Sequence, residues 1–162
     1  MPTWHSHAGT HLPGGDAAAA SGLSCAGANR RTRQVERLWP YAWVALGGAL
    51  GSVARVWLSA LVFRFAGPSF PWGTLLINVA GSALIGWFAM RTGPAGALDV
   101  SENMRVFVIA GLCGGFTTFS AFSLQTLELL QAGALARAAS YVLGSVALCL
   151  LGVWLGAMLG RA

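Results

Sequence analysis

The chain has 162 residues, of which 56% are hydrophobic and only 9% are charged, and its formal net charge is +5. Soluble domains carry charge on about a quarter of their residues, so this composition excludes an ordinary soluble globular protein. All the basic residues are arginine and they form no continuous stripe, so a nucleic-acid partner is not expected.

The N-terminal part, residues 1–39, mixes Gly, Ala, Ser and His without hydrophobic periodicity. This composition predicts a disordered N-terminal extension, followed by a membrane domain over residues 40–162. The extension lacks the basic start and the long apolar stretch of a signal peptide. Four arginines lie near its end: Arg30, Arg31, Arg33 and Arg37. Their position just before the first apolar segment is typical of the cytoplasmic flank of a membrane helix.

Four apolar segments are long enough to cross a membrane, which takes about 20 residues. They are residues 41–63, 72–90, 106–127 and 138–159. Only the first contains a charged residue, Arg55. Tryptophans lie near several segment ends, where such rings favour the membrane interface. The sequence therefore predicts an all-α, multi-pass protein of the inner or plasma membrane, with four transmembrane helices in contact with lipid.

The arginines divide unevenly between the two sides of the membrane. With four helices both chain ends lie on one side, which then carries seven arginines against two on the other. This bias places the ends in the cytoplasm. Without the N-terminal cluster the counts are three and two, so insertion of the core in both orientations stays open as an alternative.

Small residues recur four positions apart in three of the apolar segments. They are Gly47 with Gly51, Ser82 with Gly86, and Gly152 with Gly156 and Gly160. Such spacing lets helix backbones approach closely, either within one subunit or between subunits. One four-helix bundle has little room for a water-filled path, so we expect the chain to form oligomers.

The third segment contains the stretch GLCGGFTTFSAFS, residues 111–123, which crowds glycines, hydroxyl residues and phenylalanines together. Each glycine lowers helix stability by about 1 kcal/mol relative to alanine, so we expect a broken third helix at Gly114 and Gly115. Carbonyl groups freed there are suitable ligands for a hard cation such as Na⁺. Hydroxyl groups and the positive ring edges of Phe119 and Phe122 would suit a small anion.

Two further polar features occur in apolar segments. Asn78 lies in the second segment, where a buried amide is costly and indicates a functional role. Tyr141, Ser145 and Cys149 lie at positions i, i+4 and i+8 of the fourth segment, so they share one helix face. This stripe either bonds to its own backbone or lines a polar path.

Three motifs in chain order resemble those of the CrcB/Fluc family of fluoride-specific ion channels. They are GGALGSVAR at residues 47–55, WGTLLINVAGSALIG at residues 72–86, and GLCGGFTTFSAFS. The resemblance covers residues 42 to about 160. It implies passive export of fluoride from the cytoplasm, which lowers fluoride toxicity, by an antiparallel, dual-topology homodimer with two pores. A paralogue in place of the second copy is the alternative partner.

The resemblance also implies roles for individual residues by their motif positions. The backbone carbonyls of Gly114 and Thr117 would hold a structural Na⁺ that is not transported. The fluoride pore would be lined by Asn78, Phe119, Ser120, Phe122, Tyr141 and Ser145. Arg55 and Gln125 are expected at the vestibule, Arg55 in a structural role.

Two positions depart from the family pattern, which usually reads TTFSTFS followed by a glutamate. Ala121 stands at the second threonine of that pattern, and Gln125 stands at the glutamate. Ala121 removes a hydroxyl from the anion path, and Gln125 removes a carboxylate near one pore end. These departures bear on conduction rate and gating, not on a cation held by main-chain oxygen.

Two other function classes are alternatives. A small dual-topology, proton-coupled multidrug exporter would need a carboxylate within the membrane, but the first segment has none and Glu128 lies at a helix end. A non-transporting membrane assembly subunit would account for the glycine spacing, but not for Asn78 or the polar third segment. An enzyme is not expected, because no buried His, Asp or Glu group has the spacing of a catalytic or metal site.

Overall fold

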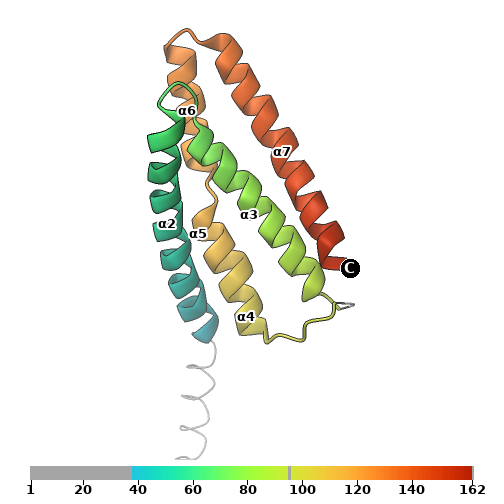
Figure 1. Cartoon of the computed structure of the whole chain (residues 1–162). Helices are drawn as coiled ribbons and strands as arrows, with labels where there is room; N and C mark the ends of the chain where they lie inside the picture. Colours follow the sequence, from blue (N-terminus) through green and yellow to red (C-terminus); the bar gives the residue numbers. More distant parts are fainter. Residues whose placement is uncertain (1–37, 95, 162) are drawn as a thin grey trace, which may run out of the picture. The chain divides into compact units, whose positions relative to one another are not determined.

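The computed structural model describes residues 38–94 and 96–161. Of the predicted extension, residues 1–39, all but the last two lie outside the described residues, and the first helix begins at Trp39. The described part is helical, as expected (Figure 1). In order, its elements are α2 (Trp39–Ala66), α3 (Trp72–Arg91), α4 (Glu102–Val106), η1 (Phe107–Cys113), α5 (Gly114–Phe116), α6 (Phe119–Gln131) and α7 (Leu135–Arg161).

The prediction of four transmembrane segments is confirmed. Among the described residues, four spans are long and apolar enough to cross a membrane: Trp39–Ala66, Trp72–Arg91, Glu102–Gln131 and Leu135–Arg161. Three of them extend past the predicted apolar segments at both ends, because polar residues continue the helices into the membrane interface. At Glu102, for example, the helix starts where Ser101 Oγ accepts a hydrogen bond from Met104 N at 3.3 Å, which caps the helix.

Glycines bring α2 into direct backbone contact with the third span. A Cβ atom at Gly47 would lie 2.5 Å from Phe107 O, and one at Gly115 would lie 2.5 Å from Gly48 O. Real Cβ atoms do not come so close to a carbonyl oxygen, so only glycine permits this packing. These small residues therefore serve packing within the subunit, which was one of the two possibilities that the sequence leaves open.

The same arrangement joins α3 to α7, which lie side by side along their length (Figure 1). A Cβ atom at Gly156 would overlap the carbonyl oxygen of Ala83, and one at Gly86 would overlap that of Val153. The ladder of glycines on α7 thus packs against α3 of the same subunit.

We expect Gly156→Ala to destabilise the protein by about 1–3 kcal/mol, the usual cost of overpacking a close contact. Gly144→Ala is the matched control on α7, because a Cβ atom there meets nothing within 4 Å. The control should be neutral or slightly stabilising, since alanine favours helix. Thermal unfolding in detergent measures both variants. Equal stability of the two would contradict the close α3–α7 packing.

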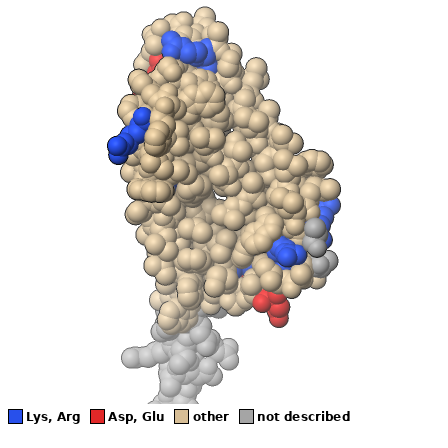
Figure 2. Space-filling view, viewed as in Figure 1, with Lys and Arg blue, Asp and Glu red and all other residues tan. Residues whose placement is uncertain are grey.

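Charged side chains gather toward the two ends of the helices, and the face between them shows almost no charged residue (Figure 2). At one end the α2–α3 and α6–α7 connections meet, where Arg137 Nη1 donates to Ser69 O at 3.0 Å. At the other end Arg105 Nη1 donates to Thr92 O at 2.5 Å, which holds the start of the third span against the end of α3. The polar residues of interest lie between these two ends.

Candidate functional site

The third span is not a uniform α-helix. Its first half includes η1, a π-helix of seven residues, and its middle contains two residues with extended backbone. These are Thr117 (φ −83°, ψ 159°) and Thr118 (φ −154°, ψ 119°), between α5 and α6. The sequence predicts the weak point at Gly114 and Gly115, but both are helical. Gly115 instead makes room for Gly48 of α2, so packing rather than unwinding explains it.

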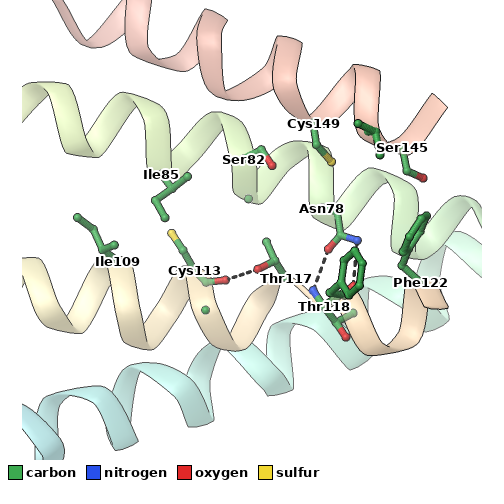
Figure 3. Close-up of a pocket in the computed structure, with 14 residues that line it drawn as sticks. Asn78, Ser82, Ile85, Ile109, Cys113, Thr117, Thr118, Phe122, Ser145 and Cys149 are labelled. Atoms are coloured by element: carbon green, nitrogen blue, oxygen red, sulfur yellow. Dashed lines mark hydrogen bonds between the residues drawn. The ribbon is translucent and has the colours of Figure 1, made fainter. Parts of the chain in front are cut away.

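Asn78 of α3 holds the extended backbone by two hydrogen bonds. Thr118 N donates to Asn78 Oδ1 at 2.8 Å, and Asn78 Nδ2 donates to Thr118 O at 3.1 Å (Figure 3). Each unsatisfied backbone group in lipid costs several kcal/mol, so the amide replaces hydrogen bonds that the helix no longer supplies. A primary amide has two N–H groups, and this pair uses one of them.

The same bonds free two carbonyl groups of the third span from their helical partners. In a continuous α-helix, Thr118 N would donate to Gly114 O, and Ala121 N would donate to Thr117 O. Here Thr118 N is directed to Asn78 Oδ1, and Ala121 N donates to Thr118 Oγ1 at 3.2 Å. The carbonyl oxygens of Gly114 and Thr117, two positions singled out from the sequence, are therefore available to another partner.

A cavity of about 390 Å³ borders the extended residues. It gathers six of the expected site residues: Asn78, Gly114, Thr117, Phe119, Phe122 and Ser145. Ser120, Tyr141, Arg55 and Gln125 do not line it.

Phe119 and Phe122, three residues apart on α6, bring their rings together beside the cavity. Their ring centroids lie 5.3 Å apart with an interplanar angle of 43°. Phe122 also contacts the ring of Tyr141, with centroids 5.1 Å apart. Phe119 is 77% exposed in the single chain, so this ring has most of its surface open to the cavity or to a neighbouring molecule.

Most hydroxyl groups near the extended residues are already hydrogen-bonded. Thr117 Oγ1 donates to Cys113 O at 2.9 Å, and Thr118 Oγ1 and Ser120 Oγ lie 3.1 Å apart in a hydrogen bond. Ser145 differs, because its side chain is 5% exposed and its Oγ has no hydrogen-bond partner in the part of the chain that the structure describes. It lines the cavity (Figure 3), where it can donate to a bound group.

Tyr141 is fully buried, and its hydroxyl donates to Gln125 Oε1 at 2.9 Å. The family resemblance implies that this hydroxyl lies in the anion path, but its proton is donated to Gln125. The spacing of the two residues gives no hint of the pair, because they lie on different helices. Gln125 borders a second cavity of about 440 Å³ rather than the first.

Arg55 lies in α2, one turn beyond Gly51. Its Nε is buried without a hydrogen-bond partner within residues 38–94 and 96–161, and it lines neither of the two cavities. Its expected structural role at the vestibule stays a prediction.

Sequence reasoning missed several residues that line the first cavity: Ser82, Ile85, Ile109 and Cys113. Ser82 could have been found, since it lies four residues after Asn78 and so on the same face of α3. The apolar members carry no comparable signal, because an isoleucine facing a cavity looks like one facing lipid.

The sequence model of the family described as "CrcB-like protein, Camphor Resistance (CrcB)" matches residues 42–157. The chain belongs to this family. Proteins named fluoride-specific ion channel FluC from Methylocella silvestris, Opitutus terrae and Rhodospirillum rubrum are similar to it. They are 54%, 57% and 56% identical over 116 residues, which is 72% of this chain and 88%, 88% and 90% of theirs. With its four spans, this CrcB family member is a multi-pass membrane protein.

Proposed function

We propose that this CrcB family member is a passive channel, not an enzyme, and that it conducts fluoride out of the cytoplasm. The observation that carries the proposal is the buried Ser145 hydroxyl, which lacks a partner among the described residues and faces the same cavity as Asn78 and the two phenylalanines. The names of its relatives as fluoride-specific ion channels support the choice of ion.

Fluoride is small and strongly hydrated, and burying a bare ion costs tens of kcal/mol in a low-dielectric medium. The cavity offers donors that would replace water: Ser145 Oγ–H, the second N–H of Asn78, and the ring edges of Phe119 and Phe122. Donors held close together would suit fluoride better than the larger chloride ion.

A passive pathway is sufficient for detoxification. HF crosses membranes as a neutral molecule and ionises in the near-neutral cytoplasm. An inside-negative potential of 100 mV is worth about 2.3 kcal/mol per charge, which favours outward fluoride by a factor of about 50. The residues lining the first cavity include no carboxylate, which counts against proton-coupled export. A non-transporting role leaves the free Ser145 donor unexplained.

Proteoliposomes loaded with fluoride or chloride test this function. The wild-type protein should release fluoride and retain chloride. Ser145→Ala should slow fluoride efflux about fivefold, since one hydrogen bond contributes a net of about 1 kcal/mol. Ser140→Ala is the matched control on the same helix, because Ser140 Oγ donates to its own backbone at Ala136 O, 2.8 Å away. Absence of wild-type fluoride efflux would refute the function, and equal efflux of the two variants would refute the role of Ser145.

The protein is further proposed to hold a structural Na⁺ that is not transported. The carbonyl oxygens of Gly114 and Thr117, released from the helical pattern, fit a hard cation, which prefers neutral or anionic oxygen ligands. Two carbonyls from one chain do not complete a coordination shell, so a second copy would contribute an equal pair. The bound cation would add positive charge beside the anion path.

An antiparallel, dual-topology homodimer is proposed for the same reason. Thr117 lies at the middle of the third span, Glu102–Gln131, and Gly114 and Ser120 beside it are exposed in the single chain. Hydrocarbon cannot hydrogen-bond free carbonyl and hydroxyl groups, so protein must cover them. In an antiparallel pair, only a feature at mid-membrane meets its own copy at the same depth. A paralogue with the same motif is the alternative partner, and the mass of the purified complex tests the pairing.

Replacing Na⁺ by K⁺ at equal ionic strength should lower fluoride efflux about tenfold and lower the melting temperature. A site at 100 times its dissociation constant contributes about 2.7 kcal/mol of stability. Efflux and thermal unfolding, measured in both salts and after return of Na⁺, test the proposal. Recovery on return is expected, and identical behaviour in both salts would contradict a sodium site.

A further inference from the structure

The second cavity, of about 440 Å³, lies at the end of the helices where the α2–α3 and α6–α7 connections meet. Among the described residues, two charged side chains line it, Glu128 of α6 and Arg137 of α7. Basic and acidic atoms are visible together at this end of the molecule (Figure 2). The cavity therefore combines one positive and one negative group with an otherwise neutral wall.

The second cavity is separated from the first by Tyr141 and Gln125. The ring of Tyr141 lies 5.1 Å from that of Phe122, which lines the first cavity, and 5.5 Å from that of Phe70, which lines the second. Gln125, which accepts the Tyr141 hydroxyl at 2.9 Å, lines the second cavity. An ion leaving the first cavity past Phe122 would therefore reach the second one at this pair.

Arg137 keeps most of its capacity to attract an anion. Its Nη1 donates to Ser69 O at 3.0 Å, but a guanidinium is a cation with five N–H donors. Glu128 lines the same cavity, and its negative charge opposes this attraction. Clefts with charged walls raise or lower the local concentration of small ions, and salt screens the effect.

We infer that the second cavity is an outer collecting site for a small monovalent anion, where Arg137 raises the local fluoride concentration and Glu128 lowers it. This inference rests on the proposed channel function. The anion here keeps its water and is held by charge alone, unlike the anion in the first cavity. The two charged residues thus set the rate at which ions are captured, not the choice between fluoride and chloride.

Fluoride currents across planar bilayers test the inference at about 20 mM and about 500 mM ionic strength, set with an impermeant sodium salt. At low ionic strength Arg137→Gln should reduce the current about threefold and Glu128→Gln should raise it about threefold. At high ionic strength both differences should shrink to less than about 1.5-fold. Arg137→Lys should keep nearly the wild-type current.

Arg64→Gln is the matched control. Arg64 lies in the last turn of α2, near the α2–α3 connection, and does not line the cavity, so the same loss of charge should lower the current clearly less than Arg137→Gln does. Equal losses in Arg137→Gln and Arg64→Gln would overturn the inference. So would a loss in Glu128→Gln, or a loss in Arg137→Lys as large as in Arg137→Gln, since each points to a purely structural role. No wild-type fluoride current would overturn the proposed function as well.

Discussion

Replacing Asn78 by aspartate is expected to reduce fluoride efflux at least about 100-fold, because an uncompensated charge in a largely desolvated site costs about 3–5 kcal/mol. The carboxylate could still accept a hydrogen bond from Thr118 N, but it could not donate one to Thr118 O. Its second oxygen and Thr118 O would both be negative and would repel each other. It would also repel an anion in the cavity. The measurement is the initial rate of efflux from proteoliposomes, with the fraction of folded protein checked by size-exclusion chromatography.

Gln131→Glu is the matched control for Asn78→Asp. It makes the same change from amide to acid at an exposed position at the end of α6, and its efflux should equal that of the wild type. If Asn78→Asp conducted as fast as this control, the hydrogen bonds of Asn78 to Thr118 would be irrelevant to the path.

Phe119→Ile should slow fluoride efflux about 30-fold while leaving the protein folded. The variant removes a ring edge that would face the ion. We take this contact to be of the same order as that of a cation on a ring face, about 2 kcal/mol when desolvated. It also removes the pairing with Phe122, whose ring centroid lies 5.3 Å away. Isoleucine keeps the residue apolar and large, so the loss reports on the ring itself.

Phe65→Ile provides the comparison, since Phe65 is 84% exposed on α2 and lines neither cavity. Both variants are measured by fluoride efflux at equal protein density. Unchanged efflux in Phe119→Ile would mean that the ring packs against another molecule and does not touch the ion.

The four spans were predictable because each is a continuous apolar segment, and hydropathy needs no knowledge of neighbours. The position of the extended residues was not. Helix propensity favours a weak point at Gly114 and Gly115, but both residues stay helical, and Gly115 packs closely against Gly48 of α2. The extended conformation at Thr118 depends on Asn78, 40 residues earlier in the chain, and no local pattern reveals such a partner.

The candidate site, too, was only partly predictable from the sequence. Asn78, Phe119 and Phe122 stood out in the sequence because polar or crowded aromatic residues are unusual in a span, and all three line one cavity. The state of each hydroxyl could not be foreseen, because it depends on which acceptor lies nearby in the folded chain. Tyr141 meets Gln125, whereas Ser145 meets no acceptor among the described residues.

The two hydrogen bonds of Asn78 have a consequence for how this protein can vary. The hydrogen bond from Thr118 N to Asn78 Oδ1 also removes that N–H from Gly114 O. One side chain therefore affects both the proposed path of the halide and the oxygen ligands proposed for sodium. Cation affinity and anion throughput are therefore expected to change in parallel whenever α3 shifts against the third span. A substitution that changes one without the other would have to act elsewhere, on a residue such as Ser145, which lines the cavity and is proposed to contact only the halide.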